Sequence, residues 1–391
     1  MSNRLPLPGH TIPYRLRLPG PTVVPERVLR AMAQPVEAHR GPAFLDRFRY
    51  SLDSLKAIVG RAGSRPFIFA SSGVGAMEAG VVNALAPGEI ALICDNGQWA
   101  QVFKRLVEGL GAKAEMVTSP WGQGIDLAAV EARLRRGGVS AVFAVHSESS
   151  TGVLADLPAL GAIVAPTDAL LVVDSVSGAG GAALDSDGWG IDILVTASQK
   201  CLMSPPGLGI ASISGKGWAR IQQPDRGPRG YFDFRRFRPQ AEAGEPTYTA
   251  PVAMVNALHQ ALTMIDEEGL ENAIARHRRL NEALRAGALV LGFTPFHSAP
   301  PTPTVVVLNT PAGVNAEALI DHMARTFNTV IAGTYTEALK ARMIRIGTMG
   351  CCSDGEVLAD LGYLARALGA LGHKADGEAA LAAAQRVLSA P

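Results

Sequence analysis

Two short apolar segments that each run into a charged side chain constrain the fold most. Residues 170–173 (Leu-Leu-Val-Val) are followed at once by Asp174, and the mostly apolar residues 191–197 lead through two polar residues to Lys200. Runs of this kind are typical of strands that are buried on both faces of a parallel sheet. Parallel strands end at the same edge of a sheet, so we expect the carboxylate and the amine to share that edge.

The rest of the chain supports a sheet of this type, because strand-like and helix-like patterns alternate along it. Repeated βαβ units imply a mainly parallel sheet with helices on both faces. The sequence predicts strands at residues 66–70, 90–94, 141–146, 170–173 and 191–197, and helices at residues 76–85, 99–110 and 157–164.

The composition changes near residue 248, where longer helical patterns begin. We predict helices at 251–265, 269–291, 316–327, 355–371 and 378–388, the last a surface helix, with strands at 304–308 and 343–347. The chain has 391 residues, 48% of them hydrophobic, which is enough for two cores. We therefore expect an N-terminal arm (1–20), a large α/β domain (21–255) and a smaller α+β domain (256–391).

The charge balance restricts the class of partner. Lysine and arginine number 36 against 35 aspartate and glutamate residues, a net charge of +1, which argues against nucleic acid and acidic membranes. No window is apolar enough to span a bilayer, and the first 18 residues do not resemble a signal peptide. The four cysteines follow neither a disulfide nor a zinc spacing. We expect a cytoplasmic protein that binds small molecules and no metal.

A lysine and a carboxylate at one sheet edge point to pyridoxal phosphate as a cofactor. This cofactor needs an amine with which to form an imine and a carboxylate that keeps its ring nitrogen protonated. The run after Lys200 ends in Pro205-Pro206-Gly207. These residues favour a turn and exclude a helix, so they hold the amine near the wall of a cleft.

The turn Ser71-Ser72-Gly73-Val74-Gly75 lies between a predicted strand and a predicted helix. Free backbone amides at the start of a helix, with a glycine that lets the backbone approach closely, favour phosphate binding. An ordinary tight turn between strand and helix explains the same pattern. A dinucleotide fingerprint does not fit here, because Glu78 stands where the third glycine would be.

Two further clusters follow predicted strands. Trp99 begins a helix after residues 95–98, where its indole could stack on a planar ring or simply pack in the core. Residues 146–152 (His-Ser-Glu-Ser-Ser-Thr-Gly) offer hydroxyls and an acid, although capping of the loop would also explain them. Such clusters coincide at the strand ends where open α/β sheets bind ligands.

A nicotinamide enzyme is the rival from another class. Residues 178–183 read Gly-Ala-Gly-Gly-Ala-Ala, a formal match to the dinucleotide motif after a strand. The context is poor, because residues 184–190 interrupt any following helix. The position that should hold an acid for the ribose lies close to Lys200 instead.

Taken together, the sequence resembles the class V aminotransferases of the pyridoxal phosphate fold type I superfamily, close to the alanine/serine–glyoxylate (or pyruvate) group. The motifs that carry the resemblance are Leu18-Pro19-Gly20-Pro21-Thr22, His39-Arg40, Ser72-Gly73, Asn96-Gly97-Gln98-Trp99, Glu148-Ser149-Ser150-Thr151-Gly152, Asp174-Ser175-Val176, Ser198-Gln199-Lys200 and Arg345-Ile346-Gly347. It implies a transaminase that moves an amino group from alanine or serine to glyoxylate or pyruvate.

The resemblance also implies a role for each site residue. Lys200 forms the imine with the cofactor and moves the proton, while Asp174 pairs with the ring nitrogen. Arg345 grips the substrate carboxylate, a task that suits a planar guanidinium. The other cofactor contacts implied are Trp99 and Val176 on the ring faces, Ser149 near the phenolic oxygen, Ser72, Gly73, Val74 and Gln199 at the phosphate, and Thr249 at the phosphate of a neighbouring subunit in a homodimer.

Some positions depart from the family pattern and leave the amino donor open. Gly178 stands where glyoxylate-using relatives often have a serine, Val74 replaces a frequently polar residue, and residues 201–203 (Cys-Leu-Met) replace the common Lys-Ala-Leu. Pyridoxamine–pyruvate and ureidoglycine-type aminotransferases are alternatives. A lyase such as a cysteine desulfurase needs a nucleophilic cysteine before Arg345, and residues 332–336 contain none.

Overall fold

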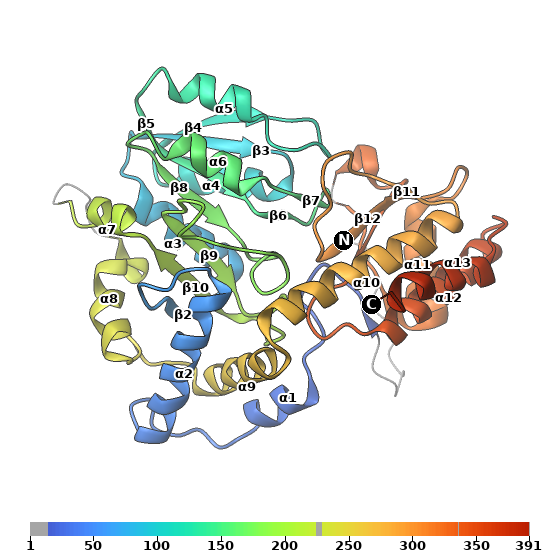
Figure 1. The fold of residues 1–391 in the computed structure, drawn as a ribbon, viewed down its shortest axis with the longest axis horizontal. Helices are drawn as coiled ribbons and strands as arrows, with labels where there is room; N and C mark the ends of the chain where they lie inside the picture. The colour runs from blue at the N-terminus through green and yellow to red at the C-terminus, as the bar shows by residue number, and fades with distance from the viewer. Residues whose placement is uncertain (1–14, 224–228, 335, 391) are drawn as a thin grey trace.

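The computed structural model describes residues 15–223, 229–334 and 336–390. A seven-stranded sheet forms the centre of the larger domain, in the order β2-β10-β9-β8-β5-β3-β4 (Figure 1). β10 is antiparallel to both of its neighbours, and the other pairs are parallel. The predicted α/β class is confirmed. The strands are β2 (Phe67–Ser71), β3 (Ile90–Asp95), β4 (Lys113–Thr118), β5 (Val139–Val145), β8 (Leu170–Asp174), β9 (Ile193–Ala197) and β10 (Gly207–Ile213).

The register of the two central strands brings the predicted charged residues to one edge. β8 and β9 pair in parallel, with Asp174 opposite Val195. β9 ends at Ala197, and Lys200 lies in the turn that follows. The short connection to Gly207 can only return the chain as an antiparallel strand, which is why β10 reverses direction.

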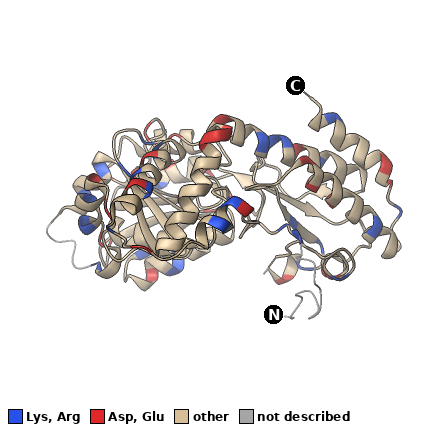
Figure 2. Ribbon diagram, turned by 90° about the horizontal axis from the view of Figure 1, so that it is seen from below, with Lys and Arg blue, Asp and Glu red and all other residues tan. Residues whose placement is uncertain are grey.

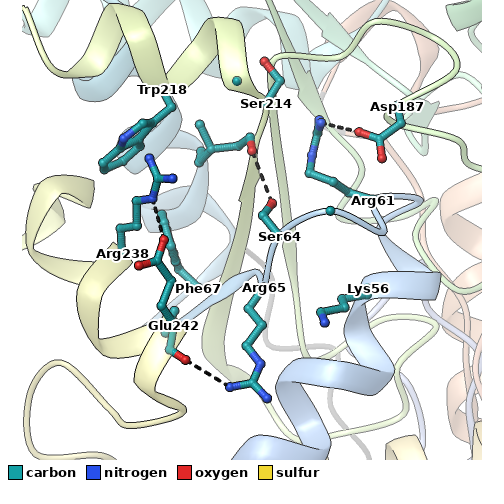
Figure 3. A pocket seen from close by; sticks show the side chains of 14 residues that line it. Lys56, Arg61, Ser64, Arg65, Phe67, Asp187, Ser214, Trp218, Arg238 and Glu242 are labelled. Carbon is teal, nitrogen blue, oxygen red and sulfur yellow. Dashed lines mark hydrogen bonds and ion pairs between the residues drawn. The ribbon is translucent and has the colours of Figure 1, made fainter.

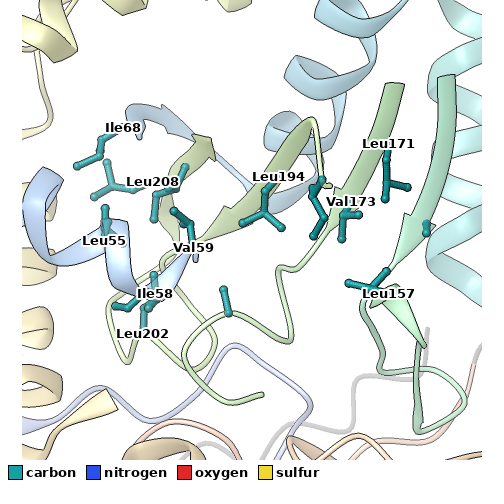
Figure 4. Packing of buried hydrophobic residues seen from close by; sticks show 14 of the residues in the cluster. Leu55, Ile58, Val59, Ile68, Leu157, Leu171, Val173, Leu194, Leu202 and Leu208 are labelled. Carbon is teal, nitrogen blue, oxygen red and sulfur yellow. The ribbon is translucent and has the colours of Figure 1, made fainter. Parts of the chain in front are cut away.

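Helices cover both faces of this sheet, and the strand residues alternate between the two layers. Leu171 and Val173 of β8 pack with α2 and α6 in one cluster, whereas Leu170 and Val172 pack with α3 and α4 in another. Figure 4 shows part of the first cluster, with Leu55 of α2 beside the strand residues. The helices are α1 (Glu26–Met32), α2 (Pro42–Ile58), α3 (Gly73–Ala84), α4 (Gln98–Gly109), α5 (Leu127–Leu134), α6 (Leu157–Val164), α7 (Gly215–Ile221), α8 (Phe234–Ala243) and α9 (Val252–Glu268).

The smaller unit is an antiparallel three-stranded sheet, β11-β12-β14, with helices packed against it. The helix predicted at 378–388 packs on α10 and α12, and its residues Ala380 and Ala384 are fully buried, so it belongs to this core. The elements are α10 (Leu270–Val290), β11 (Thr294–Pro295), β12 (Val305–Asn309), α11 (Ala316–Phe327), β14 (Met343–Gly347), α12 (Asp354–Ala370) and α13 (Gly377–Leu388).

Helix α9 joins the two units. Its residues Leu258, Leu262 and Ile265 are buried in the cluster that also holds the sheet of the larger domain. The predicted limits 21–255 and 256–391 stay predictions, and the junction between them falls inside α9. At the other end of the described chain, β1 (Arg15–Leu16) pairs with β13 (Thr329–Val330), which ties the described part of the predicted arm to the smaller unit. Most of that arm, residues 1–14, lies outside the described residues.

Acidic and basic residues are interspersed along the described ribbon, in both units of the molecule (Figure 2). Among the described residues, no helix combines the length and the apolar character that crossing a bilayer requires. The cysteines are not paired with one another, and Cys94, Cys201 and Cys352 are buried. Over the same residues, no cluster of three or more side chains has the composition of a metal site.

We predict that the central strand β8 carries much of the stability of the larger domain. Replacing the fully buried Leu171 with alanine leaves a cavity and should lower the free energy of unfolding by about 2–5 kcal/mol. Leu289→Ala is the control, since Leu289 is half exposed and its truncation should change stability by less than about 0.5 kcal/mol. Urea unfolding curves measure both, and equal effects would contradict the packing described.

Candidate active site

A cavity of about 390 Å³ lies at the carboxyl edge of the sheet, where the two units meet. Its walls come from three parts of the chain: the segment 18–21, the loops that follow the strands, and residues Ala332 and Arg345 of the smaller unit. All predicted site residues but Thr249 line this cavity, namely Ser72, Gly73, Val74, Trp99, Ser149, Asp174, Val176, Gln199, Lys200 and Arg345.

The amine of Lys200 is buried in the cavity wall. The side chain is only 7% exposed, and its Nζ donates a hydrogen bond to the carbonyl of Pro19. Burial lowers the pKa of Lys200 to about 8, and the positive charge of Arg345 acts in the same direction. A large fraction of the amine is therefore neutral in mildly alkaline solution, as a nucleophile or a general base requires.

A glycine makes room for this lysine. Gly20 has φ of +91°, in the region that other residues rarely adopt, and a Cβ at this position would collide with the Lys200 side chain. The segment is fixed from the other side as well, because Thr22 donates hydrogen bonds from its N–H to the Gln199 carbonyl (3.1 Å) and from its hydroxyl to the Lys200 carbonyl (3.1 Å).

The carboxylate of Asp174 is buried beside the same cavity. Its Oδ1 accepts a hydrogen bond of 2.7 Å from the backbone N–H of Val176. Burial raises the pKa of Asp174 to about 6, although this hydrogen bond and the charge of Lys200 both favour the ionised form. A cation or a protonated ring nitrogen placed against this carboxylate would remove the cost of its burial.

The turn before α3 has the geometry of an anion site. The helix begins at Gly73, three residues earlier than the sequence predicts, so Gly73 and Val74 belong to its first turn. Ser72 caps the helix, and its Oγ accepts a hydrogen bond of 3.2 Å from the N–H of Gly75. The positive end of the helix dipole thus faces the cavity.

Two observations indicate that this turn fits a phosphate. A Cβ built on Gly73 would lie 3.3 Å from Val176 and 3.5 Å from the Gln199 amide. A larger residue at this position would therefore fill part of the space between the turn and these two side chains. The Gln199 atom that lies beside this turn is the amide nitrogen Nε2, a hydrogen-bond donor of the kind that phosphate oxygens accept. The residues present therefore fit pyridoxal phosphate.

The indole of Trp99 lies on the cavity wall and is held in place. Its Nε1–H donates a hydrogen bond of 2.9 Å to the hydroxyl of Ser149. Because that hydroxyl oxygen acts as an acceptor here, its own hydrogen is available to a ligand, as the predicted contact of Ser149 with a phenolic oxygen requires.

Arg345 reaches the cavity from β14 in the smaller unit. Its Nε donates to the Gly333 carbonyl (2.7 Å) and its Nη1 donates to the Ser149 carbonyl (3.1 Å), so two backbone groups orient the guanidinium. The arginine and Lys200 line the same cavity, which suits a substrate whose carboxylate meets Arg345 while its amino group lies near Lys200.

Thr249 is the predicted residue that does not reach this cavity within its own chain. It lines a small separate space together with Tyr248, whose ring stacks on Tyr231 at 5.0 Å between centroids. The structure contains one chain, so the predicted contact of Thr249 with a neighbouring subunit stays a prediction.

Sequence reasoning missed the part of the wall that residues 18–21 form, although it noted them as a family motif. The signal was present in Gly20, because only a residue without a Cβ leaves room for the Lys200 side chain here. The structure also explains why Gly178 replaces a serine, because a side chain there would meet the His146 ring and the Ser175 hydroxyl. The nicotinamide alternative loses its support, since residues 178–190 form turns and no helix follows the glycines.

A larger cavity, of about 530 Å³, lies at the opposite edge of the sheet, where β2 begins and β10 ends (Figure 3). Several cations line it, but their charges are already compensated. Arg61 pairs with Asp187 (2.5 Å), and Arg238 pairs with Glu242 (2.7 Å) while stacking on Trp218. Neither Lys200 nor Asp174 is near it, so it is not the candidate active site.

Comparison with known proteins agrees with this geometry. The model of the aminotransferase class-V family matches residues 17–350. The chain belongs to this family. The class V aminotransferase relatives include a serine–glyoxylate aminotransferase of Methylorubrum extorquens, which is 32% identical over 90% of this chain and 89% of its own. A Synechococcus relative named as the small subunit of a soluble hydrogenase is 34% identical over 96% of this chain and 98% of its own.

Solved structures of class V aminotransferases share the whole fold. The ureidoglycine–glyoxylate aminotransferase of Bacillus subtilis superposes with a TM-score of 0.91 at 28% identity, covering 97% of this chain and 99% of that one. The pyridoxamine–pyruvate aminotransferase of Mesorhizobium loti gives a TM-score of 0.90 at 26% identity, covering 98% of both chains. The predicted family and fold type are confirmed.

The buried carboxylate of Asp174 predicts a pH-dependent loss of stability in the cofactor-free protein. Its pKa in the folded state, about 6, lies above 3.8, the ordinary pKa of an aspartate in an unfolded chain. The unfolded chain therefore releases the proton at a lower pH, and stability falls as pH rises between these two values. Asp174→Asn removes this effect and should stabilise the apoprotein by about 3 kcal/mol at pH 8. The gain should shrink as the pH approaches 4.

Urea unfolding of both proteins at a series of pH values tests this prediction. The amide oxygen of asparagine can still accept the N–H of Val176, so the substitution keeps the local hydrogen bond. A gain that does not vary with pH, or a loss of stability at pH 8, would contradict the assignment of the cost to burial of the charge.

Proposed function

We propose that the protein is a pyridoxal phosphate-dependent transaminase that moves the amino group of a small amino acid, alanine or serine, to glyoxylate or pyruvate. The observation that carries the proposal is the meeting of Lys200, Asp174 and Arg345 around one cavity. The anion site at Ser72 and Gly73 and the indole of Trp99 complete the set of contacts that a phosphorylated planar ring needs.

When bound, pyridoxal phosphate supplies the electron sink that makes the α-proton of an amino acid removable. The chain supplies the other functions. Asp174 would hold the ring nitrogen in its protonated form, and Arg345 would bind the α-carboxylate. Lys200, whose pKa of about 8 leaves part of the amine neutral, would accept the proton from the α-carbon of the substrate and donate it to carbon C4′ of the cofactor.

The acceptor part of the proposal is supported by the names of the relatives. Glyoxylate occurs in the names of the Methylorubrum and Bacillus proteins, and pyruvate in that of the Mesorhizobium protein. The donors in these three names are serine, ureidoglycine and pyridoxamine, so ureidoglycine and pyridoxamine are the alternatives to alanine and serine. The proposed reaction is inferred from the residues that line the cavity. The hydrogenase name of the Synechococcus relative plays no part in it.

We also propose a cytoplasmic homodimer in which Thr249 contacts the cofactor phosphate of the neighbouring subunit. This follows from the family resemblance of the segment around Thr249 and from its position outside its own cavity. A lyase of the cysteine desulfurase type is less well supported, because residues 332–336, which precede β14, contain no cysteine.

Removing the lysine should abolish the reaction. The wild-type protein with added pyridoxal phosphate should show a visible absorbance band that changes when the correct amino donor is added. Lys200→Ala should lose turnover by a factor of at least about 10⁴, since it lacks both the covalent link and the proton carrier. The control is Lys113→Ala at an exposed position, which should retain activity. Normal turnover in Lys200→Ala would refute the proposal.

Changing the arginine should affect substrate binding more than the chemical step. In Arg345→Lys a compact ammonium replaces the planar fork, so we expect KM for the amino donor to rise about 10- to 100-fold with a smaller change in kcat. Steady-state kinetics measure both constants. Arg342→Lys, at an exposed position three residues away, is the matched control and should leave both constants unchanged.

A further inference from the structure

Helix α4, which carries Trp99, begins without a cap from its own sequence. The residue before it is Gly97, which has no side chain with which to bind the first free N–H groups of the helix. These groups find acceptors on a distant segment instead. The N–H of Gln98 donates to the Ser150 hydroxyl (3.0 Å), and the N–H of Trp99 donates to Oε2 of Glu148 (3.1 Å).

Gly97 is a glycine because the capping group occupies the space beside it. Its φ of 170° is ordinary extended backbone, so the backbone conformation does not require glycine. A Cβ at this position would lie 2.5 Å from Cδ of Glu148 and 2.7 Å from the Ser150 hydroxyl. The position of the Glu148 side chain therefore requires a glycine at residue 97.

The carboxylate of Glu148 is fully buried and receives only donors. Besides the N–H of Trp99, it accepts the N–H (2.9 Å) and the hydroxyl (2.6 Å) of Ser150. Burial raises the pKa of Glu148 to about 7, whereas these three donors and the positive end of α4 favour the ionised form. Burying a carboxylate costs stability, and the group is not among those that line the cavity.

The segment that holds the backbone of Trp99 also holds its indole. Ser149, the residue after Glu148, accepts the Trp99 Nε1–H at 2.9 Å. The backbone carbonyl of Ser149 accepts a hydrogen bond from Arg345. Glu148 and Ser149 thus fix the backbone and the indole of Trp99, and Ser149 also holds the guanidinium of Arg345.

We propose that Glu148 is a positioning residue that fixes the plane of the Trp99 indole for stacking on the cofactor ring. The part of this inference that concerns the cofactor rests on the proposed function. The part that concerns the indole holds for the apoprotein alone, because every contact named above lies within the chain.

A double-mutant cycle tests whether Glu148 acts through Trp99. Glu148→Gln keeps the volume of the side chain. The two carboxylate oxygens accept hydrogen bonds from the N–H groups of Trp99 and Ser150, so the NH₂ group of the glutamine must face one of these N–H groups and cannot accept from it. The near-ultraviolet circular dichroism of the apoprotein should therefore change in Glu148→Gln. The Trp99→Phe protein should show no further change when Glu148→Gln is added.

The same four proteins are then compared by their Kd for pyridoxal phosphate. The Kd should rise about 10-fold in Glu148→Gln, the size expected for a lost hydrogen bond to a charged group, and by less than about twofold when the substitution is made in Trp99→Phe. Asp126→Asn is the control, since Asp126 also caps a helix, with a 2.9 Å bond from Ala129, but does not line the cavity. It should leave both signals unchanged.

The outcomes separate this inference from the proposed function. Equal effects of Glu148→Gln with and without Trp99, or no effect on the apoprotein spectrum, would overturn the positioning role. Failure of the wild-type protein to bind pyridoxal phosphate would overturn the proposed function instead, and the apoprotein spectra would still decide the role of Glu148.

Discussion

The burial of an amine and a carboxylate at one edge of an apolar sheet is the constraint on which the rest of the structure depends. Strands β8 and β9 are buried along their whole length, and their parallel register carries Asp174 and Lys200 to the same cavity. Neither group is stable there as an isolated charge, as their shifted pKa values show. The surrounding core offsets this cost, which is typical of sites where function and stability conflict.

The second determinant is the segment that closes the cavity over the lysine. Arg17 is almost fully buried and binds Asp360 of α12 at 2.7 Å, which anchors the segment to the smaller unit. Five residues later, Thr22 is bonded to the backbone of Lys200 in the larger unit. The chain between these two anchors forms a wall of the cavity. The site is therefore assembled from both units before any ligand binds.

Much of this arrangement is readable from the sequence, because buried parallel strands have a simple pattern and their polar ends mark the ligand edge. β10 was missed because glycines interrupt its pattern. Gly209 is needed there, since a Cβ would lie 2.6 Å from the Phe69 ring of β2. The 17-residue helix α2 was also missed, although its buried residues Phe44, Phe48, Leu52 and Leu55 follow a helical spacing. The caps of α4 could not be predicted, because they come from residues about 50 positions away.

Arg345 illustrates what this assembly means for ligand recognition. A free arginine side chain has about 2 kcal/mol of rotamer entropy to lose when it is immobilised. Here the carbonyls of Gly333 and Ser149 already orient the guanidinium. Most of that entropy is lost during folding and not in the encounter with a carboxylate. Preorganisation of this kind allows a molecule of only a few heavy atoms to be held firmly enough to react.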